Sequence, residues 1–121
     1  MDGIELGSVQ ERFADLIWEN EPIESGALVK LCAAKWDWKK STTYTVLKKL
    51  CDKGIFRNDG GTVRAVIAKE DFYAGRSKQI VKDSFCGSLP AFIAAFLQDR
   101  GLTDAEADEL QSMIEQYRKG E

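Results

Sequence analysis

Histidine is absent from this chain of 121 residues, and proline and cysteine are scarce, with two and three copies. The absence of histidine removes the usual general base of enzymes, the usual partner of a catalytic nucleophile and the commonest zinc ligand. No pair of acidic residues lies in an apolar context that would indicate a carboxylate pocket. We therefore expect a protein that is not an enzyme and that needs no cofactor and no metal.

The cysteines Cys32, Cys51 and Cys86 are far apart and form no C-x-x-C pair. Since Cys32 and Cys51 occupy apolar positions of helical patterns, buried free thiols are favoured over a metal site or a disulfide. No apolar run approaches the roughly 20 residues that span a bilayer, and the start M-D-G-I-E-L-G does not resemble a signal peptide. We expect a cytoplasmic protein without direct membrane binding.

Charge is segregated along the chain, although the formal net charge is only −3. Residues 1–29 carry one basic and seven acidic residues, residues 30–69 carry ten and three, and residues 70–121 carry six and ten. A basic block between acidic ones suits a protein that presents a single face to phosphates. An ordinary solvated lysine surface would give the same charge distribution. The residues around the lysines therefore have to distinguish a phosphate-binding face from such a surface.

Helical spacing begins at Ser8, with apolar residues Val9, Phe13, Leu16 and Ile17, and it predicts a first helix that ends near Asn20, before Pro22. A very short strand at Ile23 and a second helix from Glu24 or Ser25 follow, with a buried stripe of Leu28, Leu31 and Cys32. Trp36 and Trp38 bracket the next turn. Packing of these rings on the core is favoured over base stacking.

The third predicted helix carries the strongest functional signal. It should start near Ser41 as N-cap and stop at Gly54, with an inward face of Thr43, Val46, Leu47, Leu50 and Cys51. Its hydroxyl-rich start and its lysines are typical of a helix that enters a DNA groove. Arg64, farther along the chain, adds a basic contact. The candidate DNA-binding residues are Lys39, Lys40, Ser41, Thr42, Tyr44, Thr45, Lys48, Lys49 and Arg64.

After Gly54 the pattern changes to a β-hairpin, with a turn at Asn58-Asp59-Gly60-Gly61 and a strand over residues 62–68. Three short helices followed by a hairpin is the order of a winged helix-turn-helix. We predict a mainly α fold with a small β-hairpin wing (α+β), divided into a DNA-binding domain at 1–69 and a helical dimerisation domain at 70–121.

Residues 70–121 return to helical spacing, with Phe72, Tyr73, Ile80 and Val81 in one helix, residues 87–97 in a second, and a third that opens with a capping box at Thr103 and Glu106. Their apolar surface exceeds what short helices can cover alone. A symmetric dimer would bury it; packing onto the N-terminal part is the competing interpretation. The candidate dimer residues are Phe85, Leu89, Phe92, Ile93, Phe96, Leu97, Leu110, Met113, Ile114 and Tyr117.

With these motifs the chain resembles the penicillinase-repressor family of bacterial transcription regulators (BlaI/MecI type). The resemblance covers nearly the whole chain. It rests on W-x-x-x-P-I at 18–23, W-K-K-S-T-x-Y-T-x-L-K-x-L-x-x-K-G at 38–54, G-S-L-P-A at 87–91 and L-T-x-x-E-x-x-E-L at 102–110. It implies winged-helix domains joined to helical domains that interlock as a homodimer on an inverted-repeat DNA operator, with Ser41, Thr42, Tyr44 and Thr45 in the reading role and Lys48 in support.

The resemblance also implies derepression by a membrane-bound sensor metalloprotease, as in β-lactam resistance, with cleavage inside the dimerisation domain. The matching bond joins Ala95 and Phe96, where well-known members have Asn before Phe. The wing strand of the family is usually richer in Arg and Tyr than V-R-A-V-I is. The paired C-x-C motifs of a copper-responsive branch are missing here, which disfavours copper sensing.

The sequence thus predicts a homodimeric, sequence-specific DNA-binding transcriptional repressor. Three alternatives stay open: a winged-helix module for protein–protein interaction, a repressor of unrelated genes that responds to a non-proteolytic signal, and a small regulatory enzyme, which would need a carboxylate-lined pocket that the sequence does not indicate. Salt-dependent binding of duplex DNA separates the first alternative from the repressor.

Overall fold

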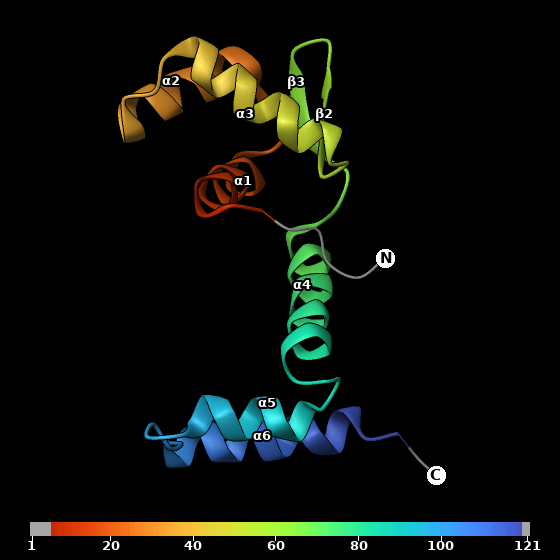
Figure 1. Ribbon diagram of the computed structural model, residues 1–121. Helices are drawn as coiled ribbons and strands as arrows, with labels where there is room; N and C mark the ends of the chain where they lie inside the picture. The colour runs from red at the N-terminus through yellow and green to blue at the C-terminus, as the bar shows by residue number, and fades with distance from the viewer. Residues whose placement is uncertain (1–5, 120–121) are drawn as a thin grey trace. The chain divides into compact units, whose positions relative to one another are not determined.

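The computed structural model describes residues 6–119, which fall into two compact units that adjoin in the chain between Ile80 and Val81. The first unit contains α1 (Ser8–Asn20), β1 (Ile23–Glu24), α2 (Ser25–Trp36), α3 (Lys40–Asp52), β2 (Phe56–Asp59), β3 (Thr62–Ala65) and most of α4 (Lys69–Ser84) (Figure 1). The second contains the end of α4, then α5 (Leu89–Leu97) and α6 (Asp104–Tyr117). The predicted α+β winged-helix class is confirmed.

The first compact unit extends past the predicted division at residue 69, which coincides with the start of α4. Phe72 of α4 is buried in the core of this unit, so the first turns of α4 pack with the helices and strands before them. The assignment of DNA binding and dimerisation to the two parts stays a prediction.

Helix α1 buries Phe13, Leu16 and Ile17, whose spacing of three and four residues places them on one side of the helix. It ends at Asn20, and Glu21 is extended ahead of Pro22, as the sequence predicted. Val9 was predicted to join the buried stripe, and this was wrong, because its side chain is 52% exposed in the first turn of the helix.

The turn between α2 and α3 is held by aromatic packing. Asp37 ends α2 in the left-handed conformation, with φ of 55°, and its N–H donates to the carbonyl of Ala33 at 3.0 Å. The ring centroids of Trp36 and Trp38 are 5.0 Å apart, and the ring of Trp38 is 5.5 Å from that of Phe13. The predicted packing of these indoles on the core is confirmed.

Helix α3 begins earlier than predicted. The residue at the N-cap is Lys39, which is extended, and Ser41 lies inside the helix, so its assignment as the cap was wrong. A capping hydroxyl is worth only about 1 kcal/mol, whereas Trp38 packs against the core on Phe13 and sets where the chain can turn into the helix. Gly54, with φ of 81°, follows the C-cap Lys53 and terminates the helix as predicted.

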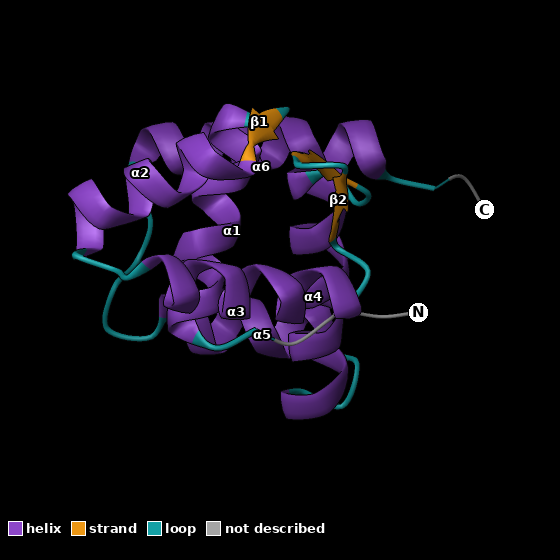
Figure 2. Cartoon of the chain, turned by 90° about the horizontal axis from the view of Figure 1, so that it is seen from above, coloured by secondary structure: helices purple, strands orange, loops and turns teal. Residues whose placement is uncertain are grey.

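The strands, which are orange in Figure 2, form one antiparallel sheet in the order β1-β3-β2. Asp59 pairs with Thr62, so the predicted hairpin has a two-residue loop, Gly60-Gly61, with φ of 59° and 100°. Strand β3 was predicted to reach Ala68 but ends at Ala65. The N–H groups of Val66 and Ile67 both donate to the carbonyl of Ile55, which turns the chain out of the ladder.

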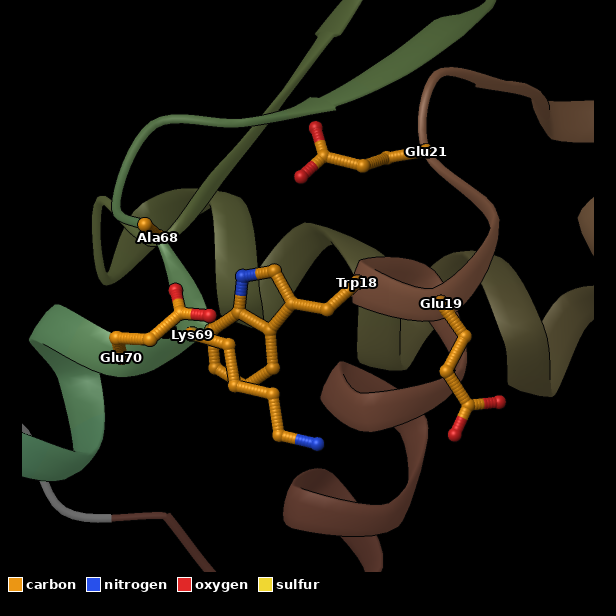
Figure 3. Close-up of a pocket in the computed structure, with 6 residues that line it drawn as sticks. All are labelled: Trp18, Glu19, Glu21, Ala68, Lys69 and Glu70. Atoms are coloured by element: carbon orange, nitrogen blue, oxygen red, sulfur yellow. The ribbon is translucent and has the colours of Figure 1, made fainter.

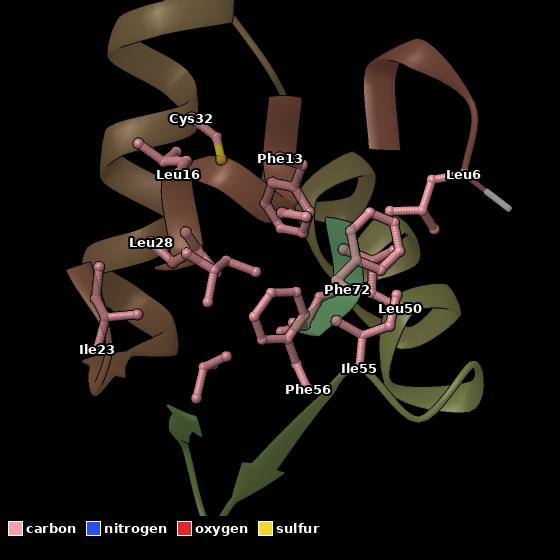
Figure 4. Close-up of a cluster of buried hydrophobic side chains, with 14 residues drawn as sticks. Leu6, Phe13, Leu16, Ile23, Leu28, Cys32, Leu50, Ile55, Phe56 and Phe72 are labelled. Atoms are coloured by element: carbon pink, nitrogen blue, oxygen red, sulfur yellow. The ribbon is translucent and has the colours of Figure 1, made fainter. Parts of the chain in front are cut away.

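The core of the first unit draws its side chains from every helix and strand of the winged helix (Figure 4). Phe13, Leu28 and Leu50 come from α1, α2 and α3, and Phe56 and Phe72 come from the wing and from α4. Each of these five side chains is at most 3% exposed. The core therefore fixes α3 and the wing in one rigid arrangement.

In the second unit, both helix starts carry side-chain caps. The hydroxyl of Ser88 accepts from the N–H of Ala91 at 3.1 Å and begins α5. The predicted capping box of α6 is confirmed: the Thr103 hydroxyl accepts from the Glu106 N–H, and the Glu106 carboxylate accepts from the Thr103 N–H, both at 3.1 Å. Among residues 6–119, no single helix is long and apolar enough to cross a membrane; α4 and α5 reach that length and composition only when taken together across a bend.

Candidate nucleic-acid interface

The outward side of α3 presents hydroxyl groups and lysines to solvent. We call this side the α3 surface, and all its members are exposed: Lys39, Lys40, Ser41, Thr42, Thr45, Lys48 and Lys49. The opposite side of the helix buries Thr43, Leu47 and Leu50, as predicted, while Val46 and Cys51 are half-buried. Because the buried side fixes the rotation of α3, the lysines and hydroxyls are held toward solvent as a group.

The N-terminal end of α3 is suited to an anion. The N-cap Lys39 makes no side-chain capping bond, and the first intrahelical bond to its carbonyl comes from the N–H of Thr43, at 3.1 Å. The backbone N–H groups ahead of Thr43 therefore have no helical acceptor, and the positive end of the helix dipole lies with them. Together with the Lys39 and Lys40 ammonium groups they can hold a phosphate.

Two threonines of the α3 surface differ in how their hydroxyl groups are used. Thr45 donates its hydroxyl proton to the carbonyl of Ser41 at 2.8 Å. The hydroxyl of Thr42 has no hydrogen bond within the described residues 6–119. Thr42 can thus donate to or accept from a partner, whereas Thr45 offers a methyl group and an acceptor.

Tyr44 lies differently from the other candidate readers. It is half-buried against the core, its hydroxyl oxygen is 3.0 Å from that of Ser25 at the start of α2, and the ammonium group of Lys40 is 5.9 Å from its ring centroid. In this arrangement Tyr44 joins α3 to α2. Reaching a base edge would require it to give up the bond to Ser25.

Two of the predicted basic residues share their charge with acidic neighbours. Lys48 lies 3.3 Å from the carboxylate of Asp52 one turn later, and the guanidinium of Arg64 lies 3.9 Å from Asp59 at the tip of the wing. These side chains are about half exposed or more, so water and salt screen both pairs. The cations remain accessible to phosphates.

Arg57 is a candidate that the sequence analysis missed. It pairs with Arg64 across the hairpin, is 64% exposed, and binds the same Asp59 carboxylate at 2.8 Å. Two guanidinium groups directly opposite each other repel, and Asp59 offsets part of that repulsion. The two-residue loop at Gly60-Gly61 was the available signal, since it fixes the register that pairs these arginines.

The candidate dimer residues lie on α5 and α6, apart from Phe85, which follows the end of α4, and neither α5 nor α6 buries a side chain fully. Leu89, Phe96, Ile114 and Tyr117 are 58–73% exposed. Phe85, Phe92 and Leu97 are half-buried, with the rings of Phe85 and Phe92 5.4 Å apart at their centroids, while Ile93, Leu110 and Met113 are exposed. The proposed cleavage bond, Ala95–Phe96, lies inside α5, near its C-terminal end.

The cysteines occupy three different environments. Cys32 is buried and Cys51 half-buried, and burial raises the pKa of both thiols above the ordinary value. Cys86 is exposed, so the expectation of a buried thiol was wrong for this residue; it occupies a left-handed turn after α4, with φ of 51°. Within residues 6–119, no three His, Cys, Asp or Glu side chains are grouped as metal ligands.

A cavity of about 250 Å³ on the first unit has three glutamates and one lysine among its six lining residues (Figure 3). Trp18 forms its floor and donates its indole N–H to the carbonyl of Ile67 at 3.0 Å, and Glu21 accepts from the N–H of Ala65 at 2.8 Å. The other lining residues are Glu19, Ala68, Lys69 and Glu70. Its acidic lining repels phosphates, so this part of the surface does not extend the basic face.

Comparison with known proteins agrees with this geometry. The family model described as "Penicillinase repressor" matches residues 6–116, which is most of the chain. A penicillinase repressor of Bacillus licheniformis is 23% identical over 107 residues, covering 85% of this chain and 84% of the relative. The family is one of regulators rather than of enzymes. The exposed helix, the wing and the match along almost the full length lead to one conclusion: the chain belongs to the penicillinase-repressor family of DNA-binding transcriptional regulators.

Proposed function

We propose that this protein represses transcription as a homodimer that occupies an inverted-repeat operator. The observation that carries the proposal is the α3 surface, where lysines and exposed hydroxyl groups surround a helix N-terminus without a side-chain cap. A helix of about 10 Å diameter with this end exposed fits the major groove of DNA. The wing arginines Arg57 and Arg64 add cations beside the helix.

The residues of this surface divide into two roles. The ammonium groups of Lys39, Lys40, Lys48 and Lys49, with Arg64, bind phosphates and set the register of the protein on the duplex. Ser41, Thr42 and Thr45 contact base edges, because their short side chains project from the first turns of α3 and can donate, accept or touch a methyl group. Tyr44 positions the helix.

Substituting one phosphate-binding residue and one base-contacting residue tests whether the two roles are separate. Lys48→Ala should weaken binding to operator and random duplexes alike and reduce the slope of log affinity against log salt by about one unit. Thr42→Ala should leave that slope unchanged and cost about 1–3 kcal/mol at one base position only. Equilibrium titrations on both duplexes at several salt concentrations measure both effects.

Two results would contradict the assignment. Equal effects of Lys48→Ala and Thr42→Ala on operator and random DNA would remove the division of roles. Binding of duplex DNA that does not weaken as salt is raised would favour the protein–protein module instead, because phosphate contacts always release counterions.

Dimerisation is the second part of the proposal. Helices α5 and α6 leave several large apolar side chains exposed, including Phe96, Ile114 and Tyr117. Burying one such side chain is worth about 1.5–3 kcal/mol, and patches of this kind mark interfaces. A two-fold arrangement places two copies of α3 about one DNA turn, roughly 34 Å, apart.

Release of the repressor is the third part. A membrane-bound sensor metalloprotease, encoded near the repressor and acting in resistance to β-lactams, cuts the bond between Ala95 and Phe96 and so separates dimerisation from DNA binding. Phe96 is 58% exposed and its ring is 5.1 Å from the Arg100 guanidinium. Because proteases bind extended chains, the C-terminal turn of α5 has to open before cleavage.

Cleavage is tested with the cytoplasmic protease domain of the neighbouring sensor. The wild-type chain should give fragments that mass spectrometry assigns to a break after Ala95. Phe96→Asp should block that break, with Phe92→Asp as the control that perturbs the same helix. Fragments with a different end, or an intact wild-type chain under induction, would replace proteolysis with another signal.

A further inference from the structure

A small cavity lies beside the turn that leads into α3. It has a volume of about 170 Å³ and is lined by Val9 and Arg12 from the first turns of α1, Trp36 from the end of α2 and Trp38 from the turn. All these residues belong to the first compact unit. A cavity of about 150 Å³ with apolar walls holds one benzene-sized ring, so this one is large enough for a single ring with a small substituent.

The aromatic wall is set by the fold and does not depend on an occupant. The left-handed conformation of Asp37 reverses the chain between the two indoles, whose planes are inclined by 46° at 5.0 Å. Trp38 is fixed from behind by Phe13 at 5.5 Å. Both indoles are only half-buried, so each keeps apolar surface free toward the cavity.

Arg12 gives the cavity its charge. It is the one basic residue of residues 1–29, it is exposed, and it makes no ion pair or hydrogen bond within residues 6–119. The adjacent Glu11 is already paired with Arg76. A guanidinium group binds a carboxylate through two parallel hydrogen bonds, which neither a lysine nor a neutral donor reproduces.

We infer that this cavity is a binding site for a small aromatic carboxylate. The ring lies between the indoles and Val9, and the carboxylate lies on the guanidinium of Arg12. This inference does not rest on the proposed DNA-binding role. It bears on that role because Trp38 directly precedes Lys39, the N-cap of α3, so an occupant contacts the turn that positions the reading helix.

Benzoate is the probe, and the indole N–H signals of the tryptophans in nuclear magnetic resonance spectra are the readout. The chain has three tryptophans, and Trp18 is not among the lining residues of this cavity. Benzoate should shift the signals of Trp36 and Trp38 with one saturation curve, half-complete on the order of 1 mM, and leave that of Trp18 unchanged. Benzamide, which has the same ring without the charge, should need about fivefold more.

Variants on the full chain test the guanidinium. Arg12→Met should weaken benzoate binding about fivefold and abolish the preference over benzamide, whereas Lys30→Met, which removes an exposed cation from α2, should change neither. Circular dichroism checks that both variants are folded. Either of two results would overturn the inference. One is signal shifts that grow linearly with benzoate concentration at all three tryptophans. The other is an unchanged preference for benzoate over benzamide in folded Arg12→Met.

Discussion

A threonine on a helix can offer DNA a hydroxyl group or a methyl group, and Thr42 and Thr45 differ in what they offer. The bond of the Thr45 hydroxyl to Ser41 O, at 2.8 Å, uses its proton inside the helix. Thymine is the base that presents a methyl group in the major groove. We therefore expect Thr45 to touch a thymine methyl and Thr42, whose hydroxyl is unoccupied within residues 6–119, to hydrogen-bond a base edge.

Substitutions that separate methyl from hydroxyl test the role of Thr45. Thr45→Val keeps the methyl group and should bind the operator almost as well as wild type. Thr45→Ser keeps the hydroxyl, loses the methyl and should bind about fourfold more weakly, since one buried methyl is worth about 0.8 kcal/mol. Replacing single operator thymines with deoxyuridine should weaken wild type at one position and leave Thr45→Ser unaffected there. Weak binding of the valine variant would show that the hydroxyl makes the contact.

At the scale of elements, α3 packs on the core and is also hydrogen-bonded to α2 by a pair of side chains. The bond between the hydroxyl groups of Tyr44 and Ser25 spans nineteen positions of the chain and joins the middle of α3 to the first residue of α2. This hydrogen bond is half-buried, so water competes less for the two hydroxyl groups than it would at the surface. The orientation of the α3 surface therefore depends on the half-buried Tyr44, through its bond to Ser25.

A double-mutant cycle measures the interaction energy between Tyr44 and Ser25. Tyr44→Phe and Ser25→Ala should each lower the free energy of unfolding by about 1 kcal/mol, and the double variant should lose less than the sum, because both changes remove the same bond. Tyr44→Phe should leave the base preference of the protein intact. Additive losses, or an altered base preference in Tyr44→Phe, would instead indicate that Tyr44 contacts DNA directly.

Elements whose ends are set by local chemistry were predictable from the sequence. Pro22 ends α1 because proline cannot continue a helix, and Gly60-Gly61 closes the hairpin because glycine readily adopts the positive φ that this turn requires. The start of α3 was missed, since the packing of Trp38 on Phe13 outweighs the capping preference of Ser41. The position of Tyr44 and the exposure of Val9 also depend on neighbours distant in the chain, which spacing alone does not reveal.

At the scale of the molecule, the segment that is expected to bind DNA differs in net charge from the segments on either side of it. The net charge of residues 30–69 is positive, and those of residues 1–29 and 70–121 are negative. Phosphates are thus attracted to α3 and the wing and repelled elsewhere. The acidic cavity at Trp18 in the first unit and the acidic helix α6 in the second unit are each unfavourable for phosphates.

Dimerisation through the second unit is the prediction that belongs to this scale. Wild type should sediment as a dimer at micromolar concentration without DNA. Phe96→Asp and Ile114→Asp each place a charge where an apolar group would be buried, and each should raise the dissociation constant of the dimer at least about tenfold. Val66→Asp is the matched control, because Val66 is 57% exposed, against 58% for Phe96, but belongs to the first unit.

The same variants connect association to operator binding. If two copies of α3 act together, Phe96→Asp should lose affinity for an inverted repeat while a single half-site, which one copy occupies, is bound as before. Val66→Asp should keep the difference between the two duplexes. A wild-type monomer at micromolar concentration, or dimers that tolerate both charged substitutions in the second unit, would assign the exposed apolar side chains of α5 and α6 to another partner.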